Sequence, residues 1–111
     1  MKHGDLSKQG FAEISQMQLN SLVKNIEFYK LENGQYPDNL QQLLFTDKFA
    51  PINDAIQSVQ QRQNPFYNYE KLGDKYLLFS SGQDGIPNTK DDLFPQILIK
   101  DSSKIGLIIS K

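Results

Sequence analysis

The 111 residues include no cysteine, no tryptophan and one histidine, and these scarcities exclude several kinds of site. Without cysteine the chain forms neither a disulfide framework nor a thiolate metal site. Because His3 is the single histidine, a metal site built from several histidines is excluded, and nucleophilic arrangements with a histidine base are strongly disfavoured. An enzyme of this sequence would depend on carboxylates, lysine or tyrosine alone.

Long apolar runs and an excess of one charge are also missing. No run approaches the roughly 18–20 apolar residues of a membrane helix, and no signal peptide is visible, so we expect the chain as given to be soluble. The net charge of −1 provides no electrostatic footprint for nucleic acid or an anionic membrane. Length and a mean hydropathy of −0.54 fit one domain, which we assign to residues 11–111 after a polar linker at 1–10.

The clearest predicted element is a helix over residues 11–32. One stripe at helical spacing runs along it, formed by Phe11, Ile14, Gln18, Leu22, Ile26 and Tyr29, and widened by Leu19, Val23 and Phe28. Gly34 and then Pro37 end the helix. About 22 residues give about 33 Å, so we expect the N-terminal part to project beyond the body. The opposite, solvated face is predicted to carry Lys24, Glu27, Lys30 and Glu32.

Shorter elements are predicted for the rest of the chain. A second helix over residues 38–45 is capped by Asp38, and residues 55–62 have room for one or two helical turns. Strands at 66–70 and 75–80 form a hairpin around Gly73, and a second hairpin follows at 96–110. Because helices come first and strands later, the predicted class is α+β, a long helix packed on a small antiparallel sheet.

The segment from Gly82 to Leu93 is rich in glycine, aspartate and asparagine, and is predicted to be a loop. It offers three carboxylates and several neutral oxygens, which are the ligand type that calcium prefers. Its spacing is not that of an EF-hand, since only Asp84-Gly85 matches that pattern. Composition alone favours a solvated turn, with cation binding as the alternative.

Two segments together resemble one known family. The helix end Ile26–Pro37 reads IEFYKLENGQYP and is similar to the YKLDNGxYP pattern of the major pseudopilin of type II secretion systems. The segment Leu78–Leu93 begins LFSSGQDG and ends TKDDL, and looks like that family's LFSxGxDG…TxDDI loop. Their order and separation match as well. The resemblance covers about residues 12–93, with a weaker match in the middle.

This resemblance implies a structural role and a metal site. Pseudopilins are type IV pilin-like subunits with a methylated N-terminus. Their apolar N-terminal helix, absent from residues 1–111, anchors them in the inner membrane, and their head is periplasmic. The implied partners are other pseudopilin subunits and secretion-system components, and no catalytic residues are implied. By position, calcium (Ca²⁺) would be bound by the side chains of Asp84, Asp91 and Asp92 and by carbonyl oxygens at Ser81 and Asn88.

The chain departs from the family pattern in two places. The family's DPWGxPY segment appears at residues 63–69 without tryptophan or glycine, and the chain continues past the acidic loop into the predicted 96–110 hairpin. A minor pseudopilin, a type IV pilin-like subunit and a freestanding secreted binding module with a cation-stabilised loop therefore remain alternatives. A carboxylate-based hydrolase using Glu70 and Asp74 is a third class, which would need a pocket holding both acids.

Overall fold

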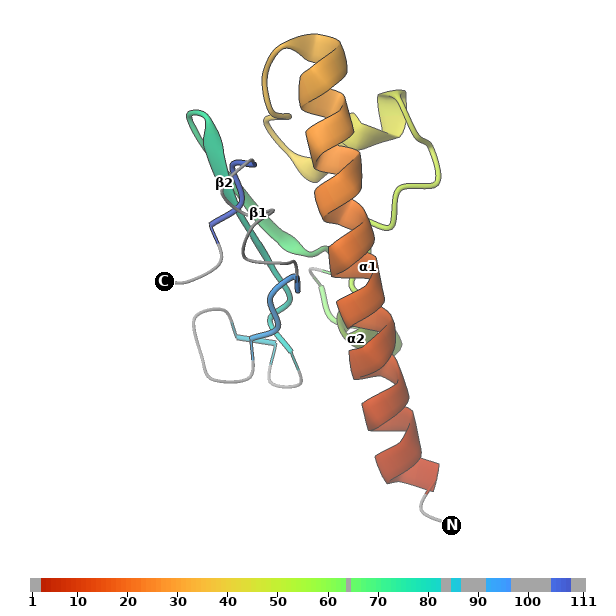
Figure 1. Cartoon of the computed structure of the whole chain (residues 1–111). Helices are drawn as coiled ribbons and strands as arrows, with labels where there is room; N and C mark the ends of the chain where they lie inside the picture. The colour runs from red at the N-terminus through yellow and green to blue at the C-terminus, as the bar shows by residue number, and fades with distance from the viewer. Residues whose placement is uncertain (1–2, 64, 83–84, 87–91, 97–104, 109–111) are drawn as a thin grey trace.

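The computed structural model describes residues 3–63, 65–82, 85–86, 92–96 and 105–108. Helix α1 (His3–Asn33) comes first, followed by the 3-10 helix η1 (Leu40–Phe45), helix α2 (Ala55–Val59) and strands β1 (Asn68–Leu72) and β2 (Lys75–Phe79). Figure 1 shows α1 lying along one side of the strands, with η1 and α2 packed beside it. The predicted α+β class, a long helix against an antiparallel sheet, is confirmed.

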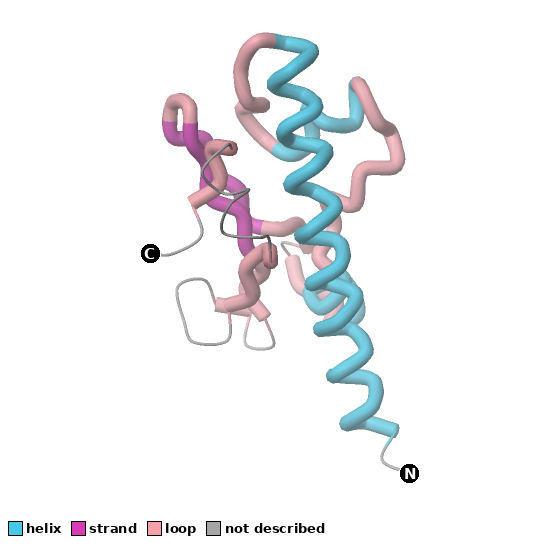
Figure 2. The backbone as a smooth tube through the Cα atoms, viewed as in Figure 1, coloured by secondary structure: helices cyan, strands magenta, loops and turns pink. Residues whose placement is uncertain are grey.

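Helix α1 is longer than predicted, because it begins at His3 rather than at residue 11. At 1.5 Å per residue it is about 46 Å long, close to the 48 Å longest dimension of the molecule. Its N-terminal part extends past the other elements, as expected from its length (Figure 2). Among the described residues, no helix combines the length and the apolar character needed to cross a membrane.

The C-terminal end of α1 follows the sequence prediction. The amide of Gly34 donates to the carbonyl of Lys30 at 2.8 Å, and Gly34 has a φ of +80°. This is the left-handed turn that glycine adopts without a Cβ clash, and it closes helices by satisfying one of the last carbonyls. Tyr36 and Pro37, which follow, are both buried and start the return of the chain along α1.

Strands β1 and β2 form an antiparallel hairpin whose register pairs Asn68 with Phe79 and Leu72 with Lys75. The observed β1 begins later than the predicted strand, because Phe66 pairs with Asn53 instead of with β2. Of the predicted 96–110 hairpin, residues 97–104 and 109–110 lie outside the described residues. The described part includes a parallel bridge from Leu107 to Tyr76.

The core lies between α1 and the hairpin. Leu19, Leu22, Val23 and Ile26 form the buried face of α1. They pack with residues from the return segment, the hairpin and the C-terminal segment: Tyr36, Leu40, Leu43, Ala50, Ile52, Tyr67, Tyr76, Leu78 and Leu107. Ile14 and Phe28, which were predicted on the apolar stripe, are exposed instead. The face of α1 that contacts the body is thus narrower than the apolar stripe.

The predicted second helix, over residues 38–45, is the shorter 3-10 helix η1 and has a different N-cap. Its N-cap is Asn39, whose Oδ1 accepts from the amide of Gln42 at 3.1 Å, and not Asp38. Asp38 instead forms an ion pair with Lys71 of β1, with 3.1 Å between Oδ1 and Nζ. The turn between α1 and η1 is therefore connected to the hairpin.

Candidate functional site

The two ends of the acidic loop are joined by backbone pairing. The amide of Ser80 donates to the carbonyl of Leu93 at 2.8 Å, and the amide of Leu93 donates back at 3.0 Å. Ser80 directly follows β2, so the loop leaves the sheet and returns to it at one point. Gly82 and Gly85 have φ values of +72° and +67°, and the Gly85 amide donates to the Gly82 carbonyl at 3.3 Å.

Two of the five predicted calcium ligands lie among the described residues. Ser81 is buried, and its Oγ accepts a hydrogen bond from Nδ2 of Asn68 at 2.8 Å. Asp92 is half-buried and adjoins the Ser80–Leu93 pair, with its Oδ1 atom shielded from solvent. The other three, Asp84, Asn88 and Asp91, lie outside the described residues. Within the described ranges no three acidic or histidine side chains gather into a metal-binding group.

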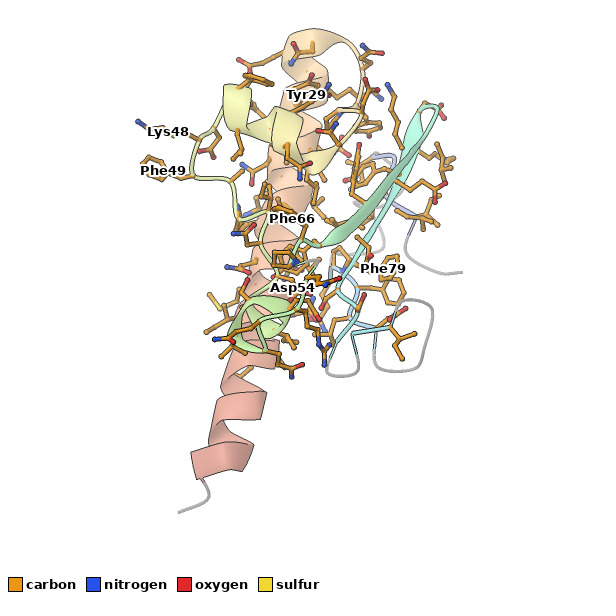
Figure 3. The ribbon with its side chains drawn as sticks, turned by 180° about the vertical axis from the view of Figure 1, so that it is seen from behind. Tyr29, Lys48, Phe49, Asp54, Phe66 and Phe79 are labelled. Atoms are coloured by element: carbon orange, nitrogen blue, oxygen red, sulfur yellow. The ribbon has the colours of Figure 1, made fainter. Side chains whose placement is uncertain are left out.

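A buried carboxylate fixes the start of this loop. Asp54 has no solvent exposure and accepts from the hydroxyl of Ser15 on α1 at 3.0 Å. It also caps α2 by accepting from the amide of Ile56 at 3.0 Å, and it accepts from the hydroxyl of Ser80. Figure 3 shows Asp54 next to α2, in the middle of the molecule. One side chain therefore connects α1, α2 and the first residue after β2.

Gln57 of α2 extends this contact into the loop. Its Nε2 donates to the carbonyl of Gly82 at 2.7 Å and lies 3.4 Å from Oδ2 of Asp54. Its Oε1 accepts from Nη1 of Arg62 at 2.8 Å. The acidic loop thus rests on a polar layer that belongs to α2 and the turn after it.

A second polar cluster lies where the C-terminal half of α1 meets the hairpin. The Glu27 carboxylate accepts from the hydroxyls of Tyr36 at 2.8 Å and Tyr76 at 3.2 Å. The Tyr36 hydroxyl accepts from the amide of Gly106 at 2.8 Å. Burial and the contact with Glu27 raise the pKa of Tyr36 to about 12. The prediction that Glu27 lies on the solvated face of α1 is wrong, because Glu27 is half-buried and bonded to two tyrosine hydroxyls.

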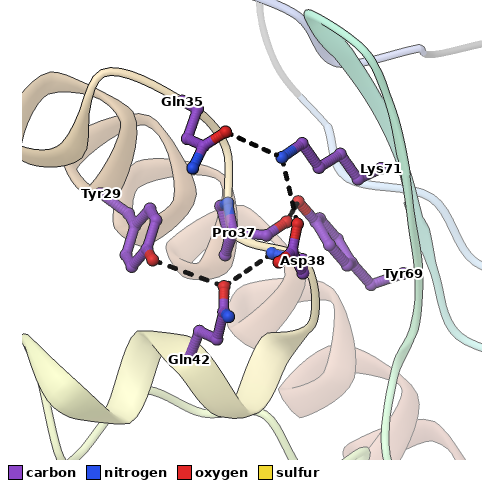
Figure 4. A network of polar contacts seen from close by, with 7 residues as sticks. All are labelled: Tyr29, Gln35, Pro37, Asp38, Gln42, Tyr69 and Lys71. Carbon is purple, nitrogen blue, oxygen red and sulfur yellow. Dashed lines mark hydrogen bonds and ion pairs between the residues drawn. The ribbon is translucent and has the colours of Figure 1, made fainter.

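Figure 4 shows how the turn after α1 is held against its neighbours. Gln42 accepts from the Tyr29 hydroxyl at 3.4 Å and from the Asp38 amide at 2.7 Å. The Tyr69 hydroxyl of β1 donates to the carbonyl of Pro37 at 2.6 Å. The residues of the Asn33–Pro37 motif therefore act structurally, by fixing the corner between α1 and η1.

The arrangement supplies positioned backbone and carboxylate oxygens, whereas the proposed hydrolytic pair lies on the exposed surface of the hairpin. Glu70 and Asp74 are both exposed, on β1 and on the hairpin turn. The buried Asp54 and the half-buried Glu27 accept hydrogen bonds from hydroxyl and amide donors. Sequence reasoning missed both. The capping role of Asp54 was readable from its place before Ala55–Val59, whereas its partners on α1 and just after β2 are distant in sequence.

Comparison with known families agrees with this geometry. The model of type II secretion system protein G matches residues 4–94. The chain belongs to the type II secretion system protein G family. This family, the major pseudopilins, has a structural role in secretion and is not an enzyme family. The match ends just after the acidic loop, and residues 105–108, which reach Tyr76, lie beyond it.

No curated protein and no solved structure matches the chain at a significant level. The family assignment therefore rests on the protein G match and on the two segments that led to the same family, Ile26–Pro37 and Leu78–Leu93. The minor pseudopilin, the pilin-like subunit and the freestanding binding module receive no support from the match.

Proposed function

We propose that this protein G family member is the periplasmic head of a major pseudopilin that assembles with further copies and with other secretion-system components. The filament so formed supports protein export. In the full-length protein an apolar, N-terminally methylated helix anchors the subunit in the inner membrane before assembly. The observation that carries this proposal is the family match over residues 4–94.

The surface of the head supports a role in assembly. Several large apolar side chains are exposed on α1, at the end of η1 and in the segment after η1: Met17, Phe28, Leu31, Phe45 and Phe49. Phe45 and Phe49 are 89% and 82% exposed, and Figure 3 shows Phe49 and its neighbour Lys48 pointing away from the body. Exposed apolar side chains mark protein contact surfaces where they form a contiguous patch. We assign them to contacts between pseudopilin heads.

The test of assembly uses the full-length gene in its own bacterium. Deleting the gene should abolish export of the secreted proteins, and the wild-type gene should restore it. Phe49→Glu should leave the head folded, because Phe49 contributes little to the core, yet it should reduce filament formation and export. Leu72→Glu, at an exposed position of the hairpin, replaces an apolar residue with the same change in charge and should export normally. Export that continues unchanged after the deletion would overturn the proposed role.

We further propose that the acidic loop binds calcium through the carboxylates of Asp84, Asp91 and Asp92, with carbonyl oxygens at Ser81 and Asn88. Three described features support it. The loop is closed by the Ser80–Leu93 pair, glycines turn its backbone, and the carboxylate of Asp92 faces inward. Calcium accepts six to eight oxygen ligands in flexible geometry, which suits carboxylates and carbonyls on one loop. Bound calcium would fix the loop to the end of β2.

The calcium prediction has a direct thermal test. An ion that binds only the folded state stabilises it by about 2.7 kcal/mol when its concentration is a hundred times the dissociation constant. We therefore expect a higher melting temperature in calcium than in chelator, and loss of this difference in Asp84→Ala. Asp74→Ala, on the exposed hairpin turn, should keep the difference. Superimposable melting curves of the wild type in calcium and in chelator would refute the metal site.

A further inference from the structure

The turn that follows η1 presents two phenylalanines to solvent on a backbone held by hydrogen bonds. Phe45 and Phe49 are almost fully exposed. Oδ1 of Asp47 accepts from the amide of Phe49 at 3.0 Å, and its Oδ2 accepts from Nδ2 of Asn25 on α1 at 3.2 Å. Residues 45–49, the 45–49 turn, are therefore fixed to α1. A partner that covers the two rings pays little to order the backbone that carries them.

The 45–49 turn also exposes a positive charge beside one of its rings. Lys48 is exposed, and its Nζ lies 5.4 Å from the centre of the Phe49 ring. Figure 3 shows both side chains pointing away from the body. In the part of the chain that the structure describes, Lys48 forms no ion pair, and the carboxylate of the adjacent Asp47 accepts from amides. A surface that fits this turn should offer an apolar recess with an acid at its edge.

An apolar recess of this kind lies on the flank of α1. It is a groove of about 300 Å³, lined by Ile14, Met17, Gln18, Ser21 and Pro51 and called the Met17 groove below. An apolar cavity of about 150 Å³ holds a benzene molecule, so the groove has room for one phenyl ring. Met17, an exposed part of its wall, has a flexible side chain that adapts to the shape of a partner.

The Met17 groove has an acid at its edge. Glu13 is exposed and precedes Met17 by four residues, so the two side chains are neighbours on one face of α1. Within the described ranges Glu13 forms no ion pair. Glu32 follows the exposed Phe28 at the same spacing farther along α1. The groove favours the position beside Met17, because an aromatic ring binds best where a pocket surrounds it.

The 45–49 turn and the Met17 groove of one molecule lie at different levels along α1. Asn25 contacts the turn, whereas Met17 lies eight residues earlier, about 12 Å along the helix at 1.5 Å per residue. The turn of one copy can therefore meet the groove of a second copy that is displaced along α1. Such a contact joins two different surfaces, and its repetition gives a ring or an open filament.

We propose that Phe49 of one head enters the Met17 groove of the next head, with Lys48 beside Glu13 of that neighbour. This inference rests on the proposed assembly of pseudopilin heads and names the two surfaces that meet. The charges at the edge fix which surfaces pair, because two turns or two grooves facing each other would bring like charges together. Successive heads are then displaced along α1 by about 12 Å.

Cysteine cross-linking tests the contact, because residues 1–111 contain no cysteine of their own. The full-length protein, in its own bacterium, carries Phe49→Cys and Met17→Cys on one chain, and mild oxidation joins cysteines whose Cα atoms lie within about 7 Å. A contact repeated head to tail gives a ladder of trimers and longer products, which neither single variant can form. Phe49→Cys with Leu72→Cys, at an exposed position of the hairpin, is the matched control and should give no ladder.

Charge reversal tests the pairing of Lys48 with Glu13. In the protein with both cysteines, Lys48→Glu alone or Glu13→Lys alone should reduce the ladder at least about twofold, because each places like charges at the edge of the contact. Both reversals together should restore it. Both positions are exposed, so melting temperatures of the variants should stay near that of the wild type. A ladder that neither single reversal weakens would overturn the charge pairing.

The remaining outcomes separate this contact from the proposed function. Dimers without a ladder would indicate a two-fold exchange of turns and would overturn the head-to-tail contact. A ladder with Phe28→Cys but not with Met17→Cys would place the contact at the end of α1 and overturn the groove. No cross-link in cells that export normally would overturn the contact and leave the proposed function intact, whereas export that continues after deletion of the gene would overturn both.

Discussion

Asp54 is a single residue on which three separate elements depend. Its carboxylate is fully buried and accepts from Ser15, Ile56 and Ser80. Asp54→Ala removes the cap of α2 and leaves buried donors without an acceptor, so we expect a loss of about 3–5 kcal/mol in the free energy of unfolding. Urea denaturation at neutral pH measures it.

The matched control for this prediction is Asp38→Ala, which makes the same chemical change at the surface. Asp38 is exposed and pairs with Lys71. An exposed ion pair contributes about 0–1 kcal/mol, so this variant should stay near the wild type. Equal losses in the two variants would show that the Asp54 contacts contribute no more to stability than a surface pair.

At Gly106 the neighbouring atoms leave no room for a side chain. A Cβ added there would lie 2.4 Å from the carbonyl oxygen of Asp74 and 2.7 Å from the hydroxyl of Tyr36. We expect Gly106→Ala to destabilise the fold by about 1–3 kcal/mol, since backbone at the hairpin turn cannot easily move away. Gly10→Ala, with nothing within 4 Å of the added atom, should instead stabilise by up to about 1 kcal/mol in the same assay.

This prediction also tests the C-terminal segment, which lies beyond the residues matched to protein G. The Gly106 amide donates to Tyr36, and Leu107 pairs with Tyr76. A neutral Gly106→Ala variant would mean that this segment does not contribute to the stability of the head.

At the scale of the elements, the ends of α1 and α2 use the same left-handed turn with different residues. Gly34 closes α1 at a φ of +80°, and Gln61 closes α2 at +56°. A left-handed residue with a Cβ costs roughly 1–2 kcal/mol. Gly34→Ala should therefore lower the free energy of unfolding by about 1 kcal/mol or more, and Gln61→Gly should raise it by about 0.5–1 kcal/mol.

Chemical denaturation of both variants measures whether the free energy of unfolding falls in Gly34→Ala and rises in Gln61→Gly. The space around Gly34 is open, so packing does not contribute to its expected loss. A loss in both variants would contradict the assignment of Gln61 to an unfavourable turn, and would indicate that its side chain makes a compensating contact.

Local chemistry explains which elements were predictable. The end of α1 was read correctly, because Gly34 and Pro37 determine it within a few residues. The hairpin was placed correctly around its glycine, yet β1 was shifted, since Phe66 pairs with Asn53 from a different part of the chain. The start of α1 was also missed, because the mostly polar residues after His3 show no apolar residues repeated at helical spacing.

The candidate site was predictable in its local part, the loop, but not in the contacts that come from distant parts of the chain. The loop ends and their glycines were found from the sequence, and two of the five proposed ligands, Ser81 and Asp92, adjoin the Ser80–Leu93 pair. The contacts of Asp54 with Ser15 and Ser80, and of Gln57 with Gly82, were not found, since these partners lie tens of residues away. Glu27 was misplaced for the same reason: its two tyrosine partners come from the return segment and from β2.

At the scale of the whole molecule, four buried or half-buried tyrosines connect the helix, the return segment and the hairpin. Burial raises the pKa of Tyr36 to about 12 and raises those of Tyr67, Tyr69 and Tyr76 further. Each hydroxyl donates a hydrogen bond in its protonated form: Tyr36 and Tyr76 to Glu27, Tyr67 to Gln18, and Tyr69 to Pro37. An anionic ring would lose both that bond and its solvation.

The consequence is a stability that falls in alkali. In the unfolded chain tyrosine loses its proton near pH 10, whereas the folded state keeps the proton of Tyr36 until about pH 12. Above pH 10 the unfolded state therefore binds fewer protons than the folded state, and stability decreases as pH rises. The contribution is fully present below pH 10 and is lost progressively as pH rises through the folded-state value.

Urea midpoints measured at successive pH values from 8 to 12 should be level at first and then fall steeply above about pH 10. Tyr36→Phe isolates one tyrosine from the lysines that titrate in the same range. It should be less stable than the wild type at pH 8, because Glu27 loses a donor and the Gly106 amide loses its acceptor. Its fall above pH 10 should be shallower, because residue 36 no longer has a proton to lose. Parallel curves for the two proteins would show that Tyr36 titrates alike in the folded and unfolded states, and that its place between α1 and the C-terminal segment does not couple proton loss to unfolding.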